Sequence, residues 1–91
     1  RNILDAERCV NRFGAGGRIP DNAFSAATSL TFRVGCGKVQ ASTLFQKLRG
    51  GDLKGACEQF TRWRYAGGVV LPGLVIRSEK ESALCMKDVK P

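Results

Sequence analysis

The fold of this 91-residue chain is decided by residues 52–85, which read DLKGACEQFTRWRYAGGVVLPGLVIRSEKESALC. Asp52 is a favourable N-cap, because its carboxylate can accept hydrogen bonds from the free backbone N–H groups of a first helical turn. Ala56, Phe60 and Trp63 then recur at helical spacing. This spacing predicts a helix with one buried stripe, in which Trp63 belongs to the core.

A glycine pair and a proline separate that helix from the next one. Gly67 and Gly68 permit positive φ and therefore end the first helix. Pro72 suits the first turn of the following helix, where its missing N–H costs nothing. That last helix is predicted from about Gly73 to Met86. Its charged residues are expected mostly on a solvated face, and they are Arg77, Glu79, Lys80 and Glu81.

Three more helices are predicted upstream of residue 52. The first spans about residues 2–13, the second about 20–34 and the third about 42–49, where Ser42 is the expected N-cap. The second carries small or apolar residues on several sides, which is typical of the central helix of a domain. Short alternating apolar strands are absent from the pattern. The sequence therefore predicts an all-α fold of about five helices.

Four cysteines, Cys9, Cys36, Cys57 and Cys85, suggest that disulfides stabilise this small domain. A domain of this size buries only about 60% of its unfolded surface, so its core is modest. The chain has no C-x-x-C pair and no histidine, and neither a metal nor a cofactor is expected. Disulfides imply an oxidising compartment, such as the periplasm or an extracellular space. Free buried thiols are the alternative, and the spacing leaves all three disulfide pairings open.

The charge balance favours anionic partners. There are 15 Lys and Arg residues against 8 Asp and Glu, which gives a net charge of +7. The positive residues are scattered, and no nucleic-acid motif is present, so a nucleic-acid-binding helical module is the weakest interpretation. A bacterial envelope, anionic through phosphates and peptide carboxylates, fits the charge and the cysteines together, although solubility alone also accounts for the charge. No segment has the roughly 18–20 apolar residues that a membrane span needs.

The order of the motifs resembles a known family. The pattern RW-x-x-AGG-x-x-LPGL-x-x-R is similar to the C-terminal signature of phage-type lysozymes, the glycoside hydrolase family 24 endolysins. It falls on Arg62, Trp63, Ala66, Gly67, Gly68, Leu71, Pro72, Gly73, Leu74 and Arg77, with the glutamate that follows at Glu81. Upstream, residues 21–37 resemble the buried helix of the family, and residues 42–56 resemble its next segment. The resemblance covers roughly residues 19–86.

This resemblance implies a single helical domain over residues 1–91, equivalent to the C-terminal lobe of a phage-encoded, bacteriolytic muramidase that cleaves peptidoglycan. The family places its catalytic glutamate, an aspartate or cysteine, and a threonine in a separate N-terminal lobe. Nothing in residues 1–18 resembles that lobe. No catalytic residue can be carried over, and the chain alone is predicted to be inactive. A cysteine nucleophile would also lack a histidine partner.

The resemblance further implies a sugar-binding wall. Phe32 and Arg33, at the end of the central helix, and Glu58, next to Cys57, are expected near bound glycan. Family members often carry Asn where Arg33 stands. The resemblance also favours pairing Cys36 with Cys57, and Cys9 with Cys85, which would join the two ends of the domain.

Two functional interpretations therefore compete. In the first, the chain is the C-terminal lobe of a lysozyme and works with the missing catalytic lobe. In the second, it is a stand-alone, non-catalytic envelope protein that binds peptidoglycan, or that binds another lysozyme and modulates or inhibits it.

Overall fold

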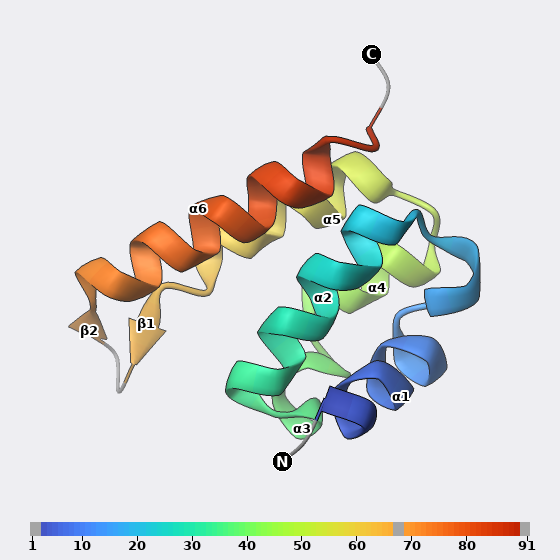
Figure 1. Ribbon diagram of the computed structural model, residues 1–91, viewed down its shortest axis with the longest axis horizontal. Helices are drawn as coiled ribbons and strands as arrows, with labels where there is room; N and C mark the ends of the chain where they lie inside the picture. The colour runs from blue at the N-terminus through green and yellow to red at the C-terminus, as the bar shows by residue number, and fades with distance from the viewer. Residues whose placement is uncertain (1–2, 67–68, 90–91) are drawn as a thin grey trace.

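Within the residues that the computed structural model describes, 3–66 and 69–89, the chain forms six α-helices, and α2 is the central one (Figure 1). The helices are α1 (Ile3–Phe13), α2 (Asp21–Val34), α3 (Cys36–Val39), α4 (Thr43–Arg49), α5 (Leu53–Gln59) and α6 (Pro72–Met86). Two short 3-10 helices, η1 (Gly16–Arg18) and η2 (Phe60–Arg62), and two strands, β1 (Tyr65–Ala66) and β2 (Val69–Val70), complete the fold. The prediction of a small all-α lobe is confirmed.

The central position of α2 follows from its small residues. Ala23, Ala26 and Ala27 are fully buried, and their short side chains allow neighbouring helices to approach closely. Helix α1 packs on one side of α2 and α6 on another. Phe45 from α4 and Phe60 from η2 are the largest fully buried side chains and fill the rest of the core.

The predicted helix starts agree with the structure. The Oγ of Ser42 accepts a hydrogen bond from the N–H of Phe45 at 3.2 Å, and Oδ1 of Asp52 accepts one from Gly55 at 3.0 Å. Pro72 occupies the first position of α6. Ser42 and Asp52 each satisfy an N–H group that a helix cannot bond internally, whereas Pro72 has no N–H to satisfy. The expected cap at Asn2 lies outside the described residues.

The stripe that begins at Ala56 is partly irregular. Helix α5 ends at Gln59, and η2 carries Phe60 before the chain straightens. Trp63 is partly buried against the core, which confirms its prediction as a core residue. Strands β1 and β2 then pair antiparallel, with Tyr65 opposite Val70, so the prediction that strands are absent was wrong at this hairpin. The helix-ending glycines of the prediction, Gly67 and Gly68, lie outside the described residues.

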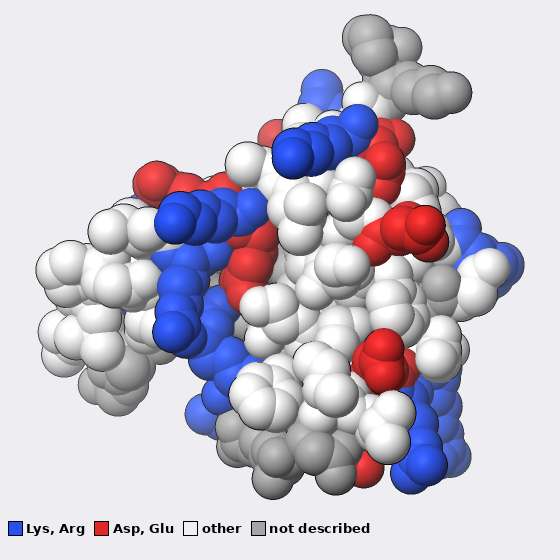
Figure 2. Space-filling model, viewed as in Figure 1, with Lys and Arg blue, Asp and Glu red and all other residues white. Residues whose placement is uncertain are grey.

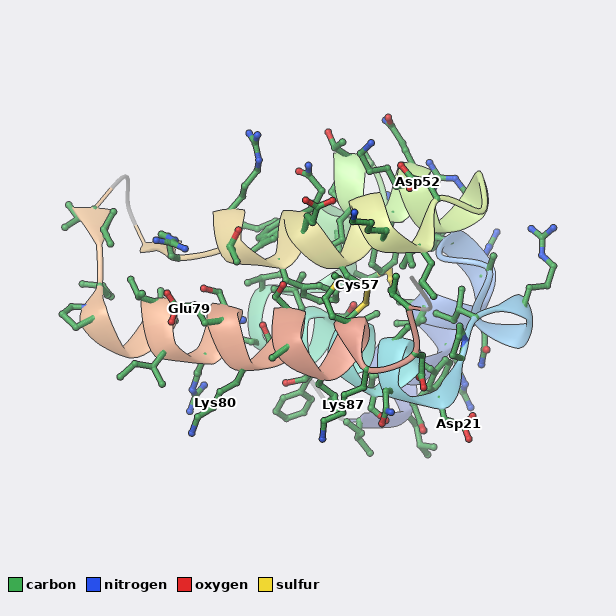
Figure 3. The ribbon with its side chains drawn as sticks, turned by 90° about the horizontal axis from the view of Figure 1, so that it is seen from above. Asp21, Asp52, Cys57, Glu79, Lys80 and Lys87 are labelled. Atoms are coloured by element: carbon green, nitrogen blue, oxygen red, sulfur yellow. A yellow bond between two sulfur atoms is a disulfide. The ribbon has the colours of Figure 1, made fainter. Side chains whose placement is uncertain are left out.

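All four cysteines form disulfides, but the predicted pairing was wrong. Cys9 is bonded to Cys36, and Cys57 is bonded to Cys85, with Cα–Cα distances of 5.8 and 5.4 Å. The reason is the packing of helices. Helix α1 lies along α2 and reaches the start of α3, whereas α5 lies beside α6 and brings the second pair together (Figure 3). The Cys57–Cys85 disulfide therefore joins two helices in contact, and Cys9–Cys36 joins two helices that both contact α2, so neither bond joins the two ends of the domain.

Candidate functional site

Two adjoining hollows run along the exposed side of α2, and we call them together the α2 groove. One, of about 360 Å³, is lined by Ile3, Glu7, Phe24, Ser25, Thr28, Ser29 and Phe32. The other, of about 270 Å³, is lined by Ser29, Phe32, Arg33, Arg77, Lys80 and Glu81. Ser29 and Phe32 belong to both hollows. The α2 groove is therefore continuous from α1 across α2 to α6.

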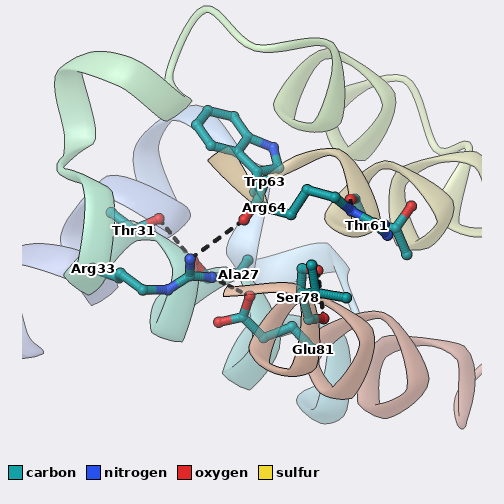
Figure 4. Close-up of polar contacts among 9 residues, drawn as sticks. Ala27, Thr31, Arg33, Thr61, Trp63, Arg64, Ser78 and Glu81 are labelled. Carbon is teal, nitrogen blue, oxygen red and sulfur yellow. Dashed lines mark hydrogen bonds and ion pairs between the residues drawn. The ribbon is translucent and has the colours of Figure 1, made fainter. Parts of the chain in front are cut away.

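An ion pair closes the floor of the groove between α2 and α6. Nη2 of Arg33 lies 2.5 Å from Oε1 of Glu81, and Nη1 of Arg33 donates to the carbonyl oxygen of Trp63 at 3.5 Å (Figure 4). The exposed fractions of the Arg33 and Glu81 side chains are only 14% and 8%. This contact joins the end of α2 to the middle of α6 beside the hollow that both residues line.

Burial raises the pKa of Glu81 above its usual value, against the opposing effects of the Arg33 charge and a hydrogen bond from Ser29. A carboxyl group with a raised pKa in a groove is a candidate proton donor in general. Here the guanidinium of Arg33 occupies one of its oxygens, so a structural ion pair accounts for the arrangement. The geometry offers a binding surface and no second carboxylate positioned against Glu81 on the groove lining described above.

The prediction that Glu81 lies on a solvated face was wrong, whereas Arg77, Glu79 and Lys80 are exposed as expected. Glu81 shares a buried stripe with Ser78 and Cys85. The spacing of three and four residues along this stripe was a signal that sequence reasoning could have used.

Two of the three predicted sugar-binding residues come together. Phe32 has 45% of its surface exposed and contributes an aromatic face to both hollows, and Arg33 lines the hollow beside α6. Glu58 is exposed on α5, where its carbonyl oxygen accepts a hydrogen bond from Thr61 at 3.0 Å. It does not belong to the lining of the α2 groove given above. Its role in glycan binding stays a prediction.

Sequence reasoning did not single out several polar residues of the groove. Thr28 is 95% buried, and its Oγ1 has no hydrogen-bond partner among the described residues. Buried polar atoms in native proteins are nearly always paired, so this hydroxyl is a place where a bound molecule or water can complete the bonding. Arg77 and Lys80 add two exposed cations to the rim on α6.

Neither a metal site nor a membrane span is found in the described part of the chain. No cluster of three or more potential metal ligands occurs among residues 3–66 and 69–89. Within the same ranges, no helix has the length and apolar character to cross a bilayer.

Comparison with known proteins identifies the family of this chain. The family model described as phage lysozyme matches residues 1–81. The chain belongs to the phage lysozyme family. It is 46% identical over 68 residues to the SAR-endolysin of Enterobacteria phage P21, a match covering 75% of this chain and 41% of that protein. It is 39% identical to the SAR-endolysin of Escherichia phage P1, covering 94% of this chain and 52% of that protein.

A solved member of the phage lysozyme family has the same fold. The crystal structure of the active form of the P1 phage endolysin Lyz superposes with a TM-score of 0.91 at 34% identity. That match covers 97% of this chain and 56% of the solved chain. The resemblance to phage-type lysozymes drawn from the short motifs is thus confirmed. The chain spans about half or less of the length of these curated relatives.

Proposed function

We propose that this chain is the C-terminal lobe of a peptidoglycan-cleaving muramidase, and that the α2 groove is one wall of its glycan-binding cleft. The observation that carries the proposal is the position of Phe32 and Arg33. Both residues lie at the C-terminal end of α2 and line one groove, as the family resemblance implies for a sugar-binding wall. Membership of the phage lysozyme family supports the same function.

The chemistry of the α2 groove suits binding. Phe32 offers an apolar face, Ser29 offers a hydroxyl, and Arg77 and Lys80 offer cations at the rim. Glycoside hydrolysis commonly needs a proton-donating carboxylic acid and a second carboxylate on opposite sides of the scissile bond. The acids of the groove lining are Glu7 and Glu81, and Glu81 is engaged by Arg33. In this proposal the catalytic residues belong to an N-terminal lobe, and the 91-residue chain alone does not cleave glycan.

The proposed partner is peptidoglycan, together with the catalytic lobe of the same enzyme. The proposed location is the periplasm or the extracellular space, and the proposed origin of the gene is a phage. Two disulfides support an oxidising compartment. The net charge of +7 supports attraction to an anionic cell wall.

A sedimentation experiment with purified peptidoglycan sacculi tests the binding wall. The oxidised chain is expected to sediment with the sacculi, and Phe32→Ala is expected to weaken this binding. Leu4→Ala is the matched control, because Leu4 is also an exposed apolar residue but does not line the α2 groove. Equal binding by Phe32→Ala and the wild type would remove Phe32 from the wall. Glu58→Gln, measured in the same series, decides whether the predicted contact of Glu58 exists.

An experiment that follows the clearing of peptidoglycan tests whether this chain alone has catalytic activity. A peptidoglycan suspension is followed with the chain alone and with the chain added to an active phage-type lysozyme. We expect no clearing by the chain alone, and clearing by it would overturn the proposal that catalysis needs another lobe. Slowed clearing in the mixture would instead support a stand-alone protein that inhibits lysozymes.

A further inference from the structure

The β hairpin and the start of α6 form an apolar projection, which we call the hairpin tip. It comprises Val69, Val70, Leu71 and Ile76, whose exposed fractions are 61%, 45%, 42% and 54%. Figure 1 shows the hairpin at the far end of α6, away from α1 and α4. Four of the seven large exposed apolar residues of the described chain are therefore gathered at one end of the molecule.

The side chains of β2 are exposed on both of its faces. Successive side chains of a strand point to opposite faces, yet Val69 and Val70 are both exposed. The strand therefore does not lie on the core with one face, as a half-buried strand would. Exposed apolar surface that is gathered in this way marks a contact with another molecule or with a membrane.

The charges next to the hairpin tip identify the kind of partner. Arg77 and Lys80 are exposed on α6, one and four residues beyond Ile76, and Arg62 is exposed on η2 just before the hairpin. Lys80 points away from α6 into the surroundings (Figure 3), and Figure 2 shows basic side chains beside the uncharged end of the molecule. Glu79 is the one exposed acid in this part of α6. The tip is therefore apolar at its end and predominantly basic behind it.

We propose that the hairpin tip binds the surface of an anionic lipid bilayer. The apolar side chains enter the boundary between headgroups and acyl chains, while the basic residues stay at the level of the lipid phosphates. The projecting position of the tip and the basic residues behind it favour this partner over a protein. A stable protein interface buries about 800 Å² on each side with complementary shape, whereas a bilayer accepts a narrow apolar projection without a matching pocket.

Vesicle sedimentation tests this proposal with the complete, oxidised 91-residue chain. Vesicles of phosphatidylglycerol and phosphatidylethanolamine are compared with vesicles of phosphatidylcholine alone. We expect binding to the anionic vesicles that weakens as salt rises, and little binding to the neutral ones. The variant Val69→Ser/Val70→Ser should bind the anionic vesicles at least about tenfold more weakly. The variant Arg62→Gln should bind the anionic vesicles about fivefold more weakly.

The matched control is Leu4→Ser on α1, because Leu4 does not line the α2 groove. Leu4 is as exposed as the valines, at 58%, but the charged residues nearest to it on α1 are the acids Asp5 and Glu7. The control variant should bind like the wild type. Ile76→Ser, which leaves the strand pairing untouched, should weaken binding in the same direction as the double valine variant, so a folding defect in the hairpin cannot mimic the result.

Three outcomes would overturn the proposal. The first is no binding of the wild type to anionic vesicles. The second is unchanged binding by both the double valine variant and Ile76→Ser, or an equal loss in the α1 control. The third is self-association in light scattering that the valine variant abolishes without any vesicle binding, which would assign the tip to a protein contact. None of these results depends on peptidoglycan binding by the α2 groove.

Discussion

Asp88, just beyond the end of α6, caps the start of the central helix through Asn22. Its Oδ2 accepts a hydrogen bond from the backbone N–H of Asn22 at 3.0 Å, and its Oδ1 accepts one from the Asn22 side-chain amide at 3.3 Å. A carboxylate at this place satisfies a free N–H of the first turn and interacts favourably with the helix dipole. The segment that follows the last helix thus caps α2 from 66 residues away.

Because of this cap, we expect a measurable loss of stability when Asp88 is substituted. Asp88→Ala should lower the free energy of unfolding by about 1 kcal/mol, the usual value of such a cap. Urea denaturation of the oxidised protein measures it, with Glu79→Ala as an exposed acidic control on α6. Equal stability of Asp88→Ala and the wild type would show that the contact contributes nothing.

Replacing only one partner of the Arg33–Glu81 ion pair should lower the free energy of unfolding. In Arg33→Met the carboxylate of Glu81 stays buried without its charge partner, and we expect a loss of about 3 kcal/mol in unfolding free energy. The double variant Arg33→Met/Glu81→Leu should lose less than the two single variants added together, because neither charge is left alone. Chemical denaturation of the four proteins gives the coupling energy. Additive losses would contradict direct coupling.

The contributions of Glu81 and Asp52 to the free energy of unfolding should change in opposite directions as pH rises. Burial raises the folded-state pKa of Glu81 above its usual value of 4.5, so its contribution favours the folded state below that pH and is lost as pH rises through the folded pKa. Glu81→Gln should therefore gain stability relative to the wild type as pH rises from 4 to 7. Denaturation midpoints across this range test the sign, and a relative loss would contradict it.

The pH dependence expected at Asp52 is the opposite of that expected at Glu81. The hydrogen bond from Gly55, together with Lys47, lowers the pKa of Asp52 below its usual value of 3.8. Its contribution is present above pH 3.8 and is lost as pH falls through the folded pKa. Asp52→Asn should therefore be less stable than the wild type near neutral pH, and the difference should shrink in acid.

The two disulfides should differ in reactivity. Cys57 and Cys85 are both fully buried, whereas Cys36 is partly exposed. Under native conditions a small thiol should therefore reduce the Cys9–Cys36 bond first, since attack needs access to a sulfur atom. Alkylation followed by peptide mass mapping gives the order. Simultaneous loss of both bonds would mean that reduction proceeds through global unfolding instead.

The sequence by itself determined the local features of this protein. Ser42, Asp52 and Pro72 start helices through groups within their own first turns, and the small residues of α2 marked it as the central helix. Short motifs also carried the family resemblance, because they reflect spacing along the chain. Phe32 and Arg33 could be proposed as sugar-binding residues because the family resemblance implies that role for them.

Only the tertiary structure decided which distant residues meet. The cysteine pairing, the burial of Glu81 against Arg33, and the cap of α2 by Asp88 each join residues 27 to 66 positions apart. The hairpin escaped prediction because strands of two residues are too short to show alternation. Helical periodicity states which face of a helix is apolar. Which helix that face meets is set by how all the helices pack around α2, and residue spacing does not contain that information.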